Sequence, residues 1–459
     1  MSALANIGNA ARLCVRRILR LYYPRIEVEG RERLPAGGAI LFVANHPNSL
    51  MDPALIGFAT QRPVHFFAKA PLFDVPVFGA LMRALGMVPA YRGQDDKAQV
   101  RKNLETLDVG AKYLRQGEAV GIFPEGKTHD REGVEQVRSG AARIACQAVQ
   151  SGAAVMVVPV GLNYERKDRF RSAIWIRVGE PIDANAWLRA RGEEEKKAMR
   201  ALTEEIDLRL KQLVVHLNEE RWQPFLPELE MLLPPGDDEA DDPIASLRQR
   251  KRFTDAMNHF LATDRPRAEA VATAIEQHRA QLANAGLTMD SPILRLGVAR
   301  LTLRLVKEAL WLLLGLIPAI AGALHHLVPF ALTRLIVRFV KHPGRATVAQ
   351  NRLMIGLPVY GLWYAAVWWL LASRTQHWIA WLWTGLMPIC GIAALHYTWR
   401  MRHAGRASWH ELKMLLRPKQ LRGLRSEQAE LRRKLRRLRE EFRATGTAAN
   451  ESAARDAPK

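Results

Sequence analysis

Short apolar runs alternate with segments of helical periodicity between Arg25 and Glu180. Five of these runs have the length and composition of buried strands: Ala39–Ala44, Val64–Ala68, Ala119–Phe123, Val155–Val160 and Ala173–Val178. Between them, apolar residues recur at helical steps over four segments: Asp52–Ala59, Phe78–Leu85, Gln99–Gln116 and Val134–Ser151. Strands separated by helices predict an α/β fold whose sheet is covered by helices.

Beyond Glu180 the pattern becomes helical and charged. Helical periodicity continues over Glu193–Asn218 and Ile244–Ala285, and an acidic run at 237–242 follows a Pro-Pro-Gly sequence that is typical of a linker. We predict six parts: a basic amphipathic membrane-interface helix at 1–28, an α/β domain with a helical extension at 29–233, an acidic linker at 234–243, a helical region at 244–300, a membrane region at 301–400 and a basic helical tail at 401–459.

Two apolar stretches near the end of the chain are long enough to cross a bilayer. Leu353–Ser373 and Trp378–Tyr397 each reach about 30 Å as helices, and both are rich in Trp and Tyr. We predict a hairpin with Ser373–His377 at the far side of the membrane, in preference to buried helices of a soluble domain. Leu303–Leu324 and Leu327–Val340 form either a second hairpin or a re-entrant pair, which gives four or two crossings.

Basic segments flank this membrane region on both sides along the chain. The positive-inside rule therefore places both termini and the α/β domain in the cytoplasm, at the cell inner membrane. In the tail, leucines recur mostly at three- and four-residue steps from Leu424 to Leu438, as in a helix lying on lipid or in a short coiled coil that permits a homodimer. We predict disorder over the small, polar Thr445–Lys459.

The N-terminal helical segment has two interpretations. Its apolar residues from Ile7 to Tyr22 cluster on one side, while Arg12, Arg16 and Arg20 line another. This pattern fits a basic helix on an anionic membrane surface, and it fits an ordinary amphipathic helix covering the core equally well. No small-residue cleavage site follows, so we do not expect a signal peptide.

The composition indicates an anionic partner and a reducing compartment. A net charge of +21 in 459 residues favours anionic phospholipids, phosphorylated substrates or nucleic acid as partners. No recognition motif supports nucleic acid, and the basic residues adjoin the membrane segments. The three cysteines have no metal-ligand spacing and predict neither a disulfide framework nor a metal site.

Polar residues follow the first buried strand in an abrupt turn. The sequence LFVANHPNSLMDP places His46 and Asp52 where a strand ends, which is where α/β enzymes keep their chemistry. An imidazole takes a proton near neutral pH, and a carboxylate on its other nitrogen fixes the tautomer. The alternative is structural: His46 as a polar cap and Asp52 as the start of a helix.

Three further strands also end in polar or charged residues. Lys69 closes the second strand and Arg92 follows Gly86–Tyr91. The sequence FPEGKTHD, from Phe123 to Asp130, contains Pro and Gly that force a tight turn, where backbone N–H groups can face an anion. A fourth stretch, Val158–Tyr164, is mostly apolar and is interpreted as a wall of the site.

These stretches, NHPNSLMD, GMVPAYR, FPEGKTHD and VVPVGLNY, resemble in order the four motifs of the glycerophospholipid acyltransferase superfamily, which includes lysophosphatidate and glycerol-3-phosphate acyltransferases. The resemblance implies an acyltransferase domain with a helix-covered mixed sheet, followed here by a helical region and C-terminal transmembrane helices. Two departures stand out. Five residues separate His46 from Asp52 where the family usually has four, and Thr128 stands where the family often has Arg. Both variants resemble the branch that acylates glycerol 3-phosphate or dihydroxyacetone phosphate.

The resemblance also implies roles for individual residues. His46 is the general base and Asp52 its orienting partner, Arg92 binds the acceptor phosphate with support from Lys69 and Lys127, and Glu125 with Gly126 binds acceptor hydroxyls. For Arg92 and Lys69 the alternative is a solvated surface charge. The acyl donor is acyl-CoA or acyl carrier protein, a co-substrate, and no other cofactor is expected.

Two alternatives to direct acyl transfer by an enzyme stay open. Ser49 and Cys146 are possible acyl carriers, but Ser49 is better interpreted as a helix cap and Cys146 as part of a buried helix face, so we favour direct transfer. The altered His–Asp spacing also permits a non-catalytic membrane scaffold or lipid-binding protein that has kept the fold.

Overall fold

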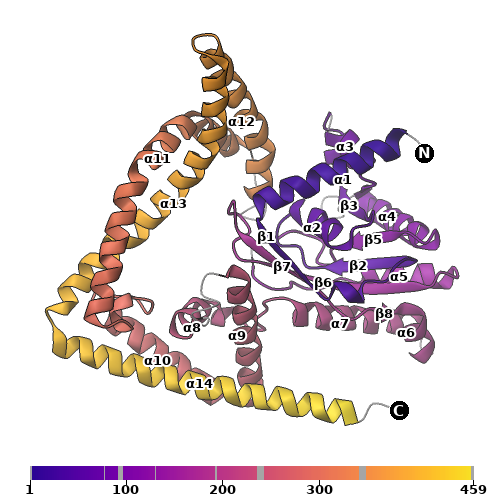
Figure 1. Cartoon of the computed structure of the whole chain (residues 1–459). Helices are drawn as coiled ribbons and strands as arrows, with labels where there is room; N and C mark the ends of the chain where they lie inside the picture. The colour runs from indigo at the N-terminus through magenta and orange to yellow at the C-terminus, as the bar shows by residue number, and fades with distance from the viewer. Residues whose placement is uncertain are drawn as a thin grey trace. The chain divides into compact units, whose positions relative to one another are not determined.

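The computed structural model describes residues 3–76, 78–90, 97–129, 131–191, 194–234, 242–340 and 348–455. The chain, shown in Figure 1, divides into two compact units. The first is Met1–Leu217 with Asp241–Lys251 and His342–Gln350, and the second is Asn218–Ala240 with Arg252–Lys341 and Asn351–Lys459.

The first unit is built on one mixed sheet. Its strands are β1 (Arg25–Glu29), β2 (Ala39–Ala44), β3 (His65–Lys69), β4 (Val88–Ala90), β5 (Ala119–Ile122), β6 (Val155–Tyr164), β7 (Ala173–Val178) and β8 (Ile182–Asp183). They are ordered β1-β7-β6-β2-β5-β3-β4, with β8 paired to β6. The central strand β2 is parallel to β5 and β6, whereas β6 and β7 are antiparallel. The predicted α/β fold with a mixed sheet is confirmed.

Helices cover this sheet. They are α1 (Ala3–Tyr22), α2 (Met51–Thr60), α3 (Phe78–Ala84), α4 (Lys97–Arg115), α5 (Gly140–Gln150), α6 (Ala184–Arg191) and α7 (Glu195–Leu213), with short 3-10 turns η1 (Arg31–Arg33) and η2 (Ala70–Phe73). Leu41 of β2 packs in one buried cluster with Leu114 of α4, Ile144 of α5 and Ile206 of α7. Each such side chain contributes about 1.5–3 kcal/mol by leaving water. In Figure 1, α1 lies on the opposite side of the sheet from α7.

All five predicted apolar strands are present, and β4 lies within the Gly86–Tyr91 stretch that was predicted to end a strand. Two strands were missed, β1 and β8, because β1 is polar and β8 is very short. The helix predicted from Val134 begins instead at Gly140. The residues before it form a loop. The Arg138 N–H donates to the carbonyl of Pro124 at 2.9 Å, and not to a carbonyl four residues earlier as it would in a helix.

The second unit is helical among its described residues. It contains η3 (Glu220–Phe225), α8 (Leu226–Leu232), η5 (Pro292–Leu294), α11 (Val298–Phe339), α12 (Val348–Ala372), α13 (His377–Leu415) and α14 (Pro418–Arg455), together with α10 (Arg265–Asn284) and most of α9 (Pro243–Thr263). The helix predicted over Ile244–Ala285 is therefore two helices. Asp264 separates them, because its side chain accepts a hydrogen bond from the Arg267 N–H and caps α10. Residues 235–241 of the predicted linker lie outside the described residues.

The basic tail packs against its own unit. In α14, Leu424, Leu431 and Leu435 are buried, and the Arg425 guanidinium donates to the carbonyls of Ile293 and Leu296. The leucine face that suggested a homodimer is thus covered within the chain. The predicted disorder over Thr445–Lys459 is wrong as far as Arg455, because α14 continues to that residue.

Within the part of the chain that the structure describes, three helices are long and apolar enough to cross a membrane: Ala299–Phe339, Asn351–Ala372 and His377–Met401. The predicted hairpin is present as α12 and α13. The predicted break between Leu324 and Leu327 is wrong, because α11 is one helix. The two histidines at that point do not form a turn. Instead, the His326 ring bonds the Tyr364 hydroxyl at 2.8 Å, and His325 Nδ1 accepts from Trp383 at 3.3 Å.

Candidate active site

The turn between β2 and α2 brings His46 and Asp52 together. His46 Nδ1 lies 2.8 Å from Asp52 Oδ2, and the same oxygen accepts a hydrogen bond from the Asn48 N–H at 2.7 Å. Ser49 adopts a left-handed φ of 44°, which lets the chain reverse before α2 begins at Met51. The turn therefore brings the two predicted side chains into contact across five intervening residues.

The second oxygen of the Asp52 carboxylate is bound by a tyrosine. Tyr164, the last residue of β6, donates its hydroxyl to Asp52 Oδ1 at 2.6 Å. Burial, with the nearby Asp52 charge, raises the pKa of Tyr164 well above its ordinary value. The phenol therefore stays protonated and remains a donor, which fixes the carboxylate that orients His46.

An aromatic ring holds the plane of the His46 imidazole. Phe123, which follows β5, stacks on it with ring centroids 4.0 Å apart and an interplanar angle of 11°. The His46 side chain is 15% exposed, whereas the Asp52 side chain is fully buried. Nε2 of His46 has no hydrogen-bond partner in the part of the chain that the structure describes. This nitrogen is thus the one that can exchange a proton with a bound molecule.

Glu125 lies on the other side of the same turn. Its Oε2 accepts from the His46 backbone N–H at 3.3 Å and bonds His129 Nε2 at 2.6 Å. Gly126 makes the turn with a φ of +72°, a conformation that favours glycine. Glu125 Oε1 is buried and has no partner among the described residues. A buried carboxylate oxygen without a donor is costly, so it is a natural acceptor for a ligand hydroxyl.

The three residues predicted to bind phosphate, Lys127, Lys69 and Arg92, differ in their surroundings. Lys127 pairs with Glu135 at 2.9 Å. Burial alone would raise the pKa of Glu135, but the hydrogen bond from Lys127 and the nearby charges of His129, Lys127 and Arg131 together lower that pKa. Lys69 ends β3 and is exposed. Arg92 lies outside the described residues, so its position is not compared with the prediction.

Of the two possible acyl carriers, Cys146 lies in a position unlike that of a nucleophile. It lies on the buried face of α5 and is 2% exposed. Burial raises its pKa to about 11, so it stays a thiol near neutral pH. Ser49 lies in the turn between His46 and Asp52, and its predicted role as a helix cap is wrong, because the N-cap of α2 is Leu50 and no side chain caps the helix.

Among the described residues, no group of three or more His, Cys, Asp or Glu side chains is arranged to hold a metal ion.

Residues 25–163 match the family model described as Acyltransferase. The chain carries an acyltransferase-family domain. In sequence it is 40% identical over 82 residues to "Glycerol-3-phosphate O-acyltransferase 2" of Saccharomyces cerevisiae, a match covering 17% of this chain and 11% of the relative. It is 31% identical over 143 residues to the chloroplastic 1-acyl-sn-glycerol-3-phosphate acyltransferase LPAT1 of Arabidopsis thaliana, covering 30% of this chain and 37% of the relative. The chain thus spans well under half the length of both relatives.

A solved structure is also similar. The crystal structure of the 1-acyl-sn-glycerophosphate acyltransferase PlsC from Thermotoga maritima aligns with 44% of this chain and 76% of its own, at 21% sequence identity and a TM-score of 0.31.

The acyltransferase domain uses residues that the sequence did not point to. Asn48 donates its side-chain amide to the Tyr23 hydroxyl and to the Lys167 carbonyl, both at 2.9 Å. Lys167 Nζ donates to the carbonyl of His129 at 2.9 Å. Tyr164 and His129 lie within two of the four motifs, so a Tyr or His near the end of a predicted strand could have identified them. Tyr23 and Lys167 lie outside the motifs, and only the folding of the chain brings them to the site.

Proposed function

We propose that this protein is a membrane-bound O-acyltransferase of phospholipid biosynthesis. It moves a fatty acyl group from acyl-CoA or acyl carrier protein to a hydroxyl of glycerol 3-phosphate or lysophosphatidate. The observation that carries the proposal is the His46–Asp52 pair, with one imidazole nitrogen held by a buried carboxylate and the other unbonded. The Acyltransferase match over residues 25–163 supports it.

The pair can perform both proton transfers of the reaction. His46 Nε2 takes the proton of the acceptor hydroxyl as its oxygen attacks the thioester carbonyl carbon. The tetrahedral intermediate then collapses, the C–S bond breaks, and the same proton passes to the leaving thiolate. Asp52 stays ionised and stabilises the imidazolium between the two steps. No covalent acyl-enzyme is required, and the acyl donor is consumed as a co-substrate with no metal or further cofactor.

Acceptor binding is assigned to the turn that follows β5. With glycerol 3-phosphate, Glu125 Oε1 is the open acceptor for the hydroxyl next to the one that reacts, and with lysophosphatidate it accepts from the single free hydroxyl. The phosphate of the acceptor is assigned to Arg92, Lys69 and Lys127, and Gly126 lets the backbone approach it closely. A site with both a carboxylate and cations suits an acceptor molecule that carries a hydroxyl at one end and a phosphate at the other.

The membrane region enters and leaves the bilayer on one side. Residues just before α11 are bonded to residues just after α13: Arg425 donates to Ile293 and Leu296, and Gln428 donates to the Met289 carbonyl at 2.8 Å. The number of crossings between them is therefore even. Because α12 and α13 are joined by a short tip, we assign them as a pair of crossings. We assign that side to the cytoplasm, with anionic phospholipids facing the basic segments.

Acyl transfer by the full-length protein in detergent tests the proposal. Labelled acyl-CoA is offered with glycerol 3-phosphate and with lysophosphatidate in parallel, and products are separated by lipid chromatography. Wild type is compared with His46→Ala and Asp52→Asn, and each variant is checked for an unchanged melting temperature. Loss of a general base costs about 10²–10⁴-fold in rate.

Product from one acceptor, lost in folded His46→Ala, supports the enzyme and names its acceptor. A repeat with acyl carrier protein as donor separates the two donors. Equal activity of wild type and His46→Ala overturns the base assignment. No product with any donor or acceptor favours a non-catalytic membrane scaffold.

A further inference from the structure

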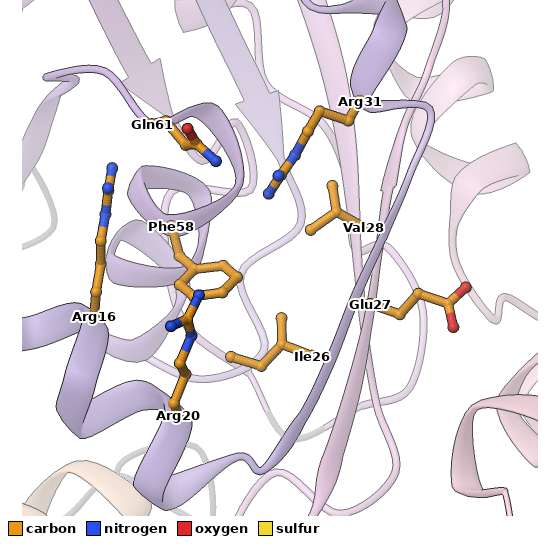
Figure 2. A pocket seen from close by; sticks show the side chains of 8 residues that line it. All are labelled: Arg16, Arg20, Ile26, Glu27, Val28, Arg31, Phe58 and Gln61. Atoms are coloured by element: carbon orange, nitrogen blue, oxygen red, sulfur yellow. The ribbon is translucent and has the colours of Figure 1, made fainter.

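A second pocket lies away from the catalytic turn, bordered by α1, β1, η1 and the end of α2 (Figure 2). Its volume is about 350 Å³, within the range of small-molecule sites. Its lining comprises three arginines, three apolar side chains, an amide and a carboxylate, among them Arg16, Arg20, Arg31, Ile26, Phe58 and Gln61.

This pocket is separate from the candidate active site. Helix α2 carries Asp52 in its first turn and ends at Thr60, with Gln61 as its C-cap. Nine residues at about 1.5 Å each place Gln61 about 14 Å along the helix from Asp52. Arg31 follows the end of β1, which is parallel to β7 and so runs opposite to β2. The arginine thus lies toward the end of the sheet away from His46.

The charge in this pocket is positive. None of the three arginines forms an ion pair with a carboxylate of a described residue: Arg16 donates to the Gly57 carbonyl at 3.4 Å, and the Arg20 guanidinium lies 5.5 Å from the Phe58 ring centroid. Glu27 is the carboxylate of the lining, but it is bonded to Arg248 of α9 and points away from the arginines (Figure 2). Three guanidiniums around one space match a phosphate group, whose oxygens accept several charge-assisted hydrogen bonds.

The surroundings match a lipid better than a free anion. On α1, Leu19 and Tyr22 are buried, whereas Leu13 and Leu21 are each 57% exposed. With 3.6 residues per turn, Arg16 and Arg20 lie beside Leu13, whereas Leu21 lies farther round the helix, with Arg17 between the two leucines. Ile26 and Phe58 add an apolar wall inside the pocket. A molecule with a phosphate and adjoining hydrocarbon contacts both features at once.

We propose that this pocket binds the phosphate group of an anionic glycerophospholipid, and so docks the acyltransferase domain on the membrane surface. The lipid headgroup lies among Arg16, Arg20 and Arg31, and its glycerol and acyl carbons lie against Ile26, Phe58 and the exposed Leu13 of α1. The proposal does not depend on the reaction at His46.

Isothermal titration of the full-length protein in detergent tests this site. The probe is dihexanoyl phosphatidylglycerol, a soluble anionic lipid that is neither acceptor nor product of the proposed reaction. Arg16→Gln/Arg20→Gln removes two pocket charges, and Arg12→Gln/Arg17→Gln removes two charges from the same helix outside the pocket. Arg31→Gln tests the pocket from another element, and His46→Ala tests independence from the catalytic turn.

We expect Arg16→Gln/Arg20→Gln to bind the lipid about tenfold more weakly than wild type. Hydrogen bonds between a guanidinium and a phosphate are charge-assisted, and they are stronger than bonds between neutral groups. Arg31→Gln should weaken binding in the same direction, and the Arg12/Arg17 and His46 variants should bind like wild type. Equal loss in the two double variants overturns the site in favour of the general charge of α1. If inorganic phosphate at the same concentration as the lipid displaces it completely, the pocket is a site for free phosphate and the proposal is overturned. If CoA displaces the lipid completely, the pocket binds the acyl donor instead.

Discussion

The carboxylate of Asp52 accepts hydrogen bonds from three groups: the His46 ring, the Asn48 backbone N–H and the Tyr164 hydroxyl. Only the first of these belongs to the reacting pair. The Asn48 N–H and the Tyr164 hydroxyl hold the carboxylate in place, although these two residues are more than a hundred positions apart in the sequence. Tyr164 is therefore a positioning residue, which acts on the reaction through Asp52.

Replacing Tyr164 by Phe removes one charge-assisted hydrogen bond and keeps the ring. We expect kcat to fall about tenfold, since such bonds contribute about 1.5–3 kcal/mol. The KM values for donor and acceptor should stay near wild type, because the hydroxyl does not reach the substrate. Steady-state kinetics of acyl transfer measure both. Tyr113→Phe, on α4 of the same domain, is the matched control, and a rise in KM with unchanged kcat would contradict the positioning role.

Glu125 and Glu132 allow a matched test of acceptor binding. Glu125→Gln removes the charge from the carboxylate that has an open oxygen, so we expect the acceptor KM to rise about tenfold while the donor KM is unchanged. Glu132→Gln, seven residues on and paired with Arg250, should leave the acceptor KM near wild type. Kinetics with the acceptor varied at fixed donor decide between them. Equal effects in the two variants would remove the acceptor role from Glu125.

The sequence predicted those residues of the site that lie within short motifs at strand ends. His46, Asp52, Glu125 and Gly126 occur in short motifs at strand ends, so the strand-end rule places them together. Tyr23 and Lys167 lie far from those motifs and carry no signal of their own. They join the site through the pairing of β6 with its neighbours and the packing of α1, which are long-range consequences of the fold.

At the scale of elements, α11 is where the sequence pattern misled. His325 and His326 interrupt an apolar run and predicted a break, but their rings bond Tyr364 and Trp383. A polar pair that finds partners on neighbouring helices does not need a turn. The helix also carries Pro318 and Pro329 in its interior, which bend a helix without ending it.

Cysteine labelling tests the arrangement of these helices in the membrane. In a chain with Cys14, Cys146 and Cys390 replaced by Ala, single cysteines are placed at Ser373 and Thr445. We expect a membrane-impermeant maleimide to label the Ser373 site on intact spheroplasts, because it lies at the tip between α12 and α13. The Thr445 site should react only after permeabilisation. Labelling at Thr445 from outside would contradict the cytoplasmic assignment of the basic tail.

At the scale of the whole molecule, each unit is held together by residues distant in sequence. In the first unit, the Val134 N–H donates to His216 Nδ1 at 3.2 Å, which ties the loop after β5 to the end of α7. Burial lowers the pKa of His216 to about 4. In the unfolded chain this histidine has an ordinary pKa near 6.5, so the unfolded state binds the proton more tightly. The folded state therefore loses stability as the pH falls from about 6.5 toward about 4.

His216→Gln keeps a hydrogen-bond acceptor and removes this titration. We expect the melting temperature of the variant to fall less steeply than that of wild type between pH 6.5 and pH 4. Melting of the purified protein across this pH range measures the slope. His377→Gln, at an exposed position after the α12 tip, should keep the wild-type slope. An unchanged slope in His216→Gln would assign the acid sensitivity to other groups.

The residue that follows α1 connects attachment to catalysis. The Tyr23 hydroxyl accepts from the Asn48 side chain, and the Asn48 backbone N–H bonds Asp52, so two residues link this helix to the catalytic carboxylate. A helix seated on lipid holds Tyr23 in place, and a helix released from lipid leaves the turn less restrained. We expect a higher kcat in anionic lipid nanodiscs than in detergent, and Tyr23→Phe should narrow that difference. The same contact would make the enzyme interfacially activated, working fastest at the surface that receives its product.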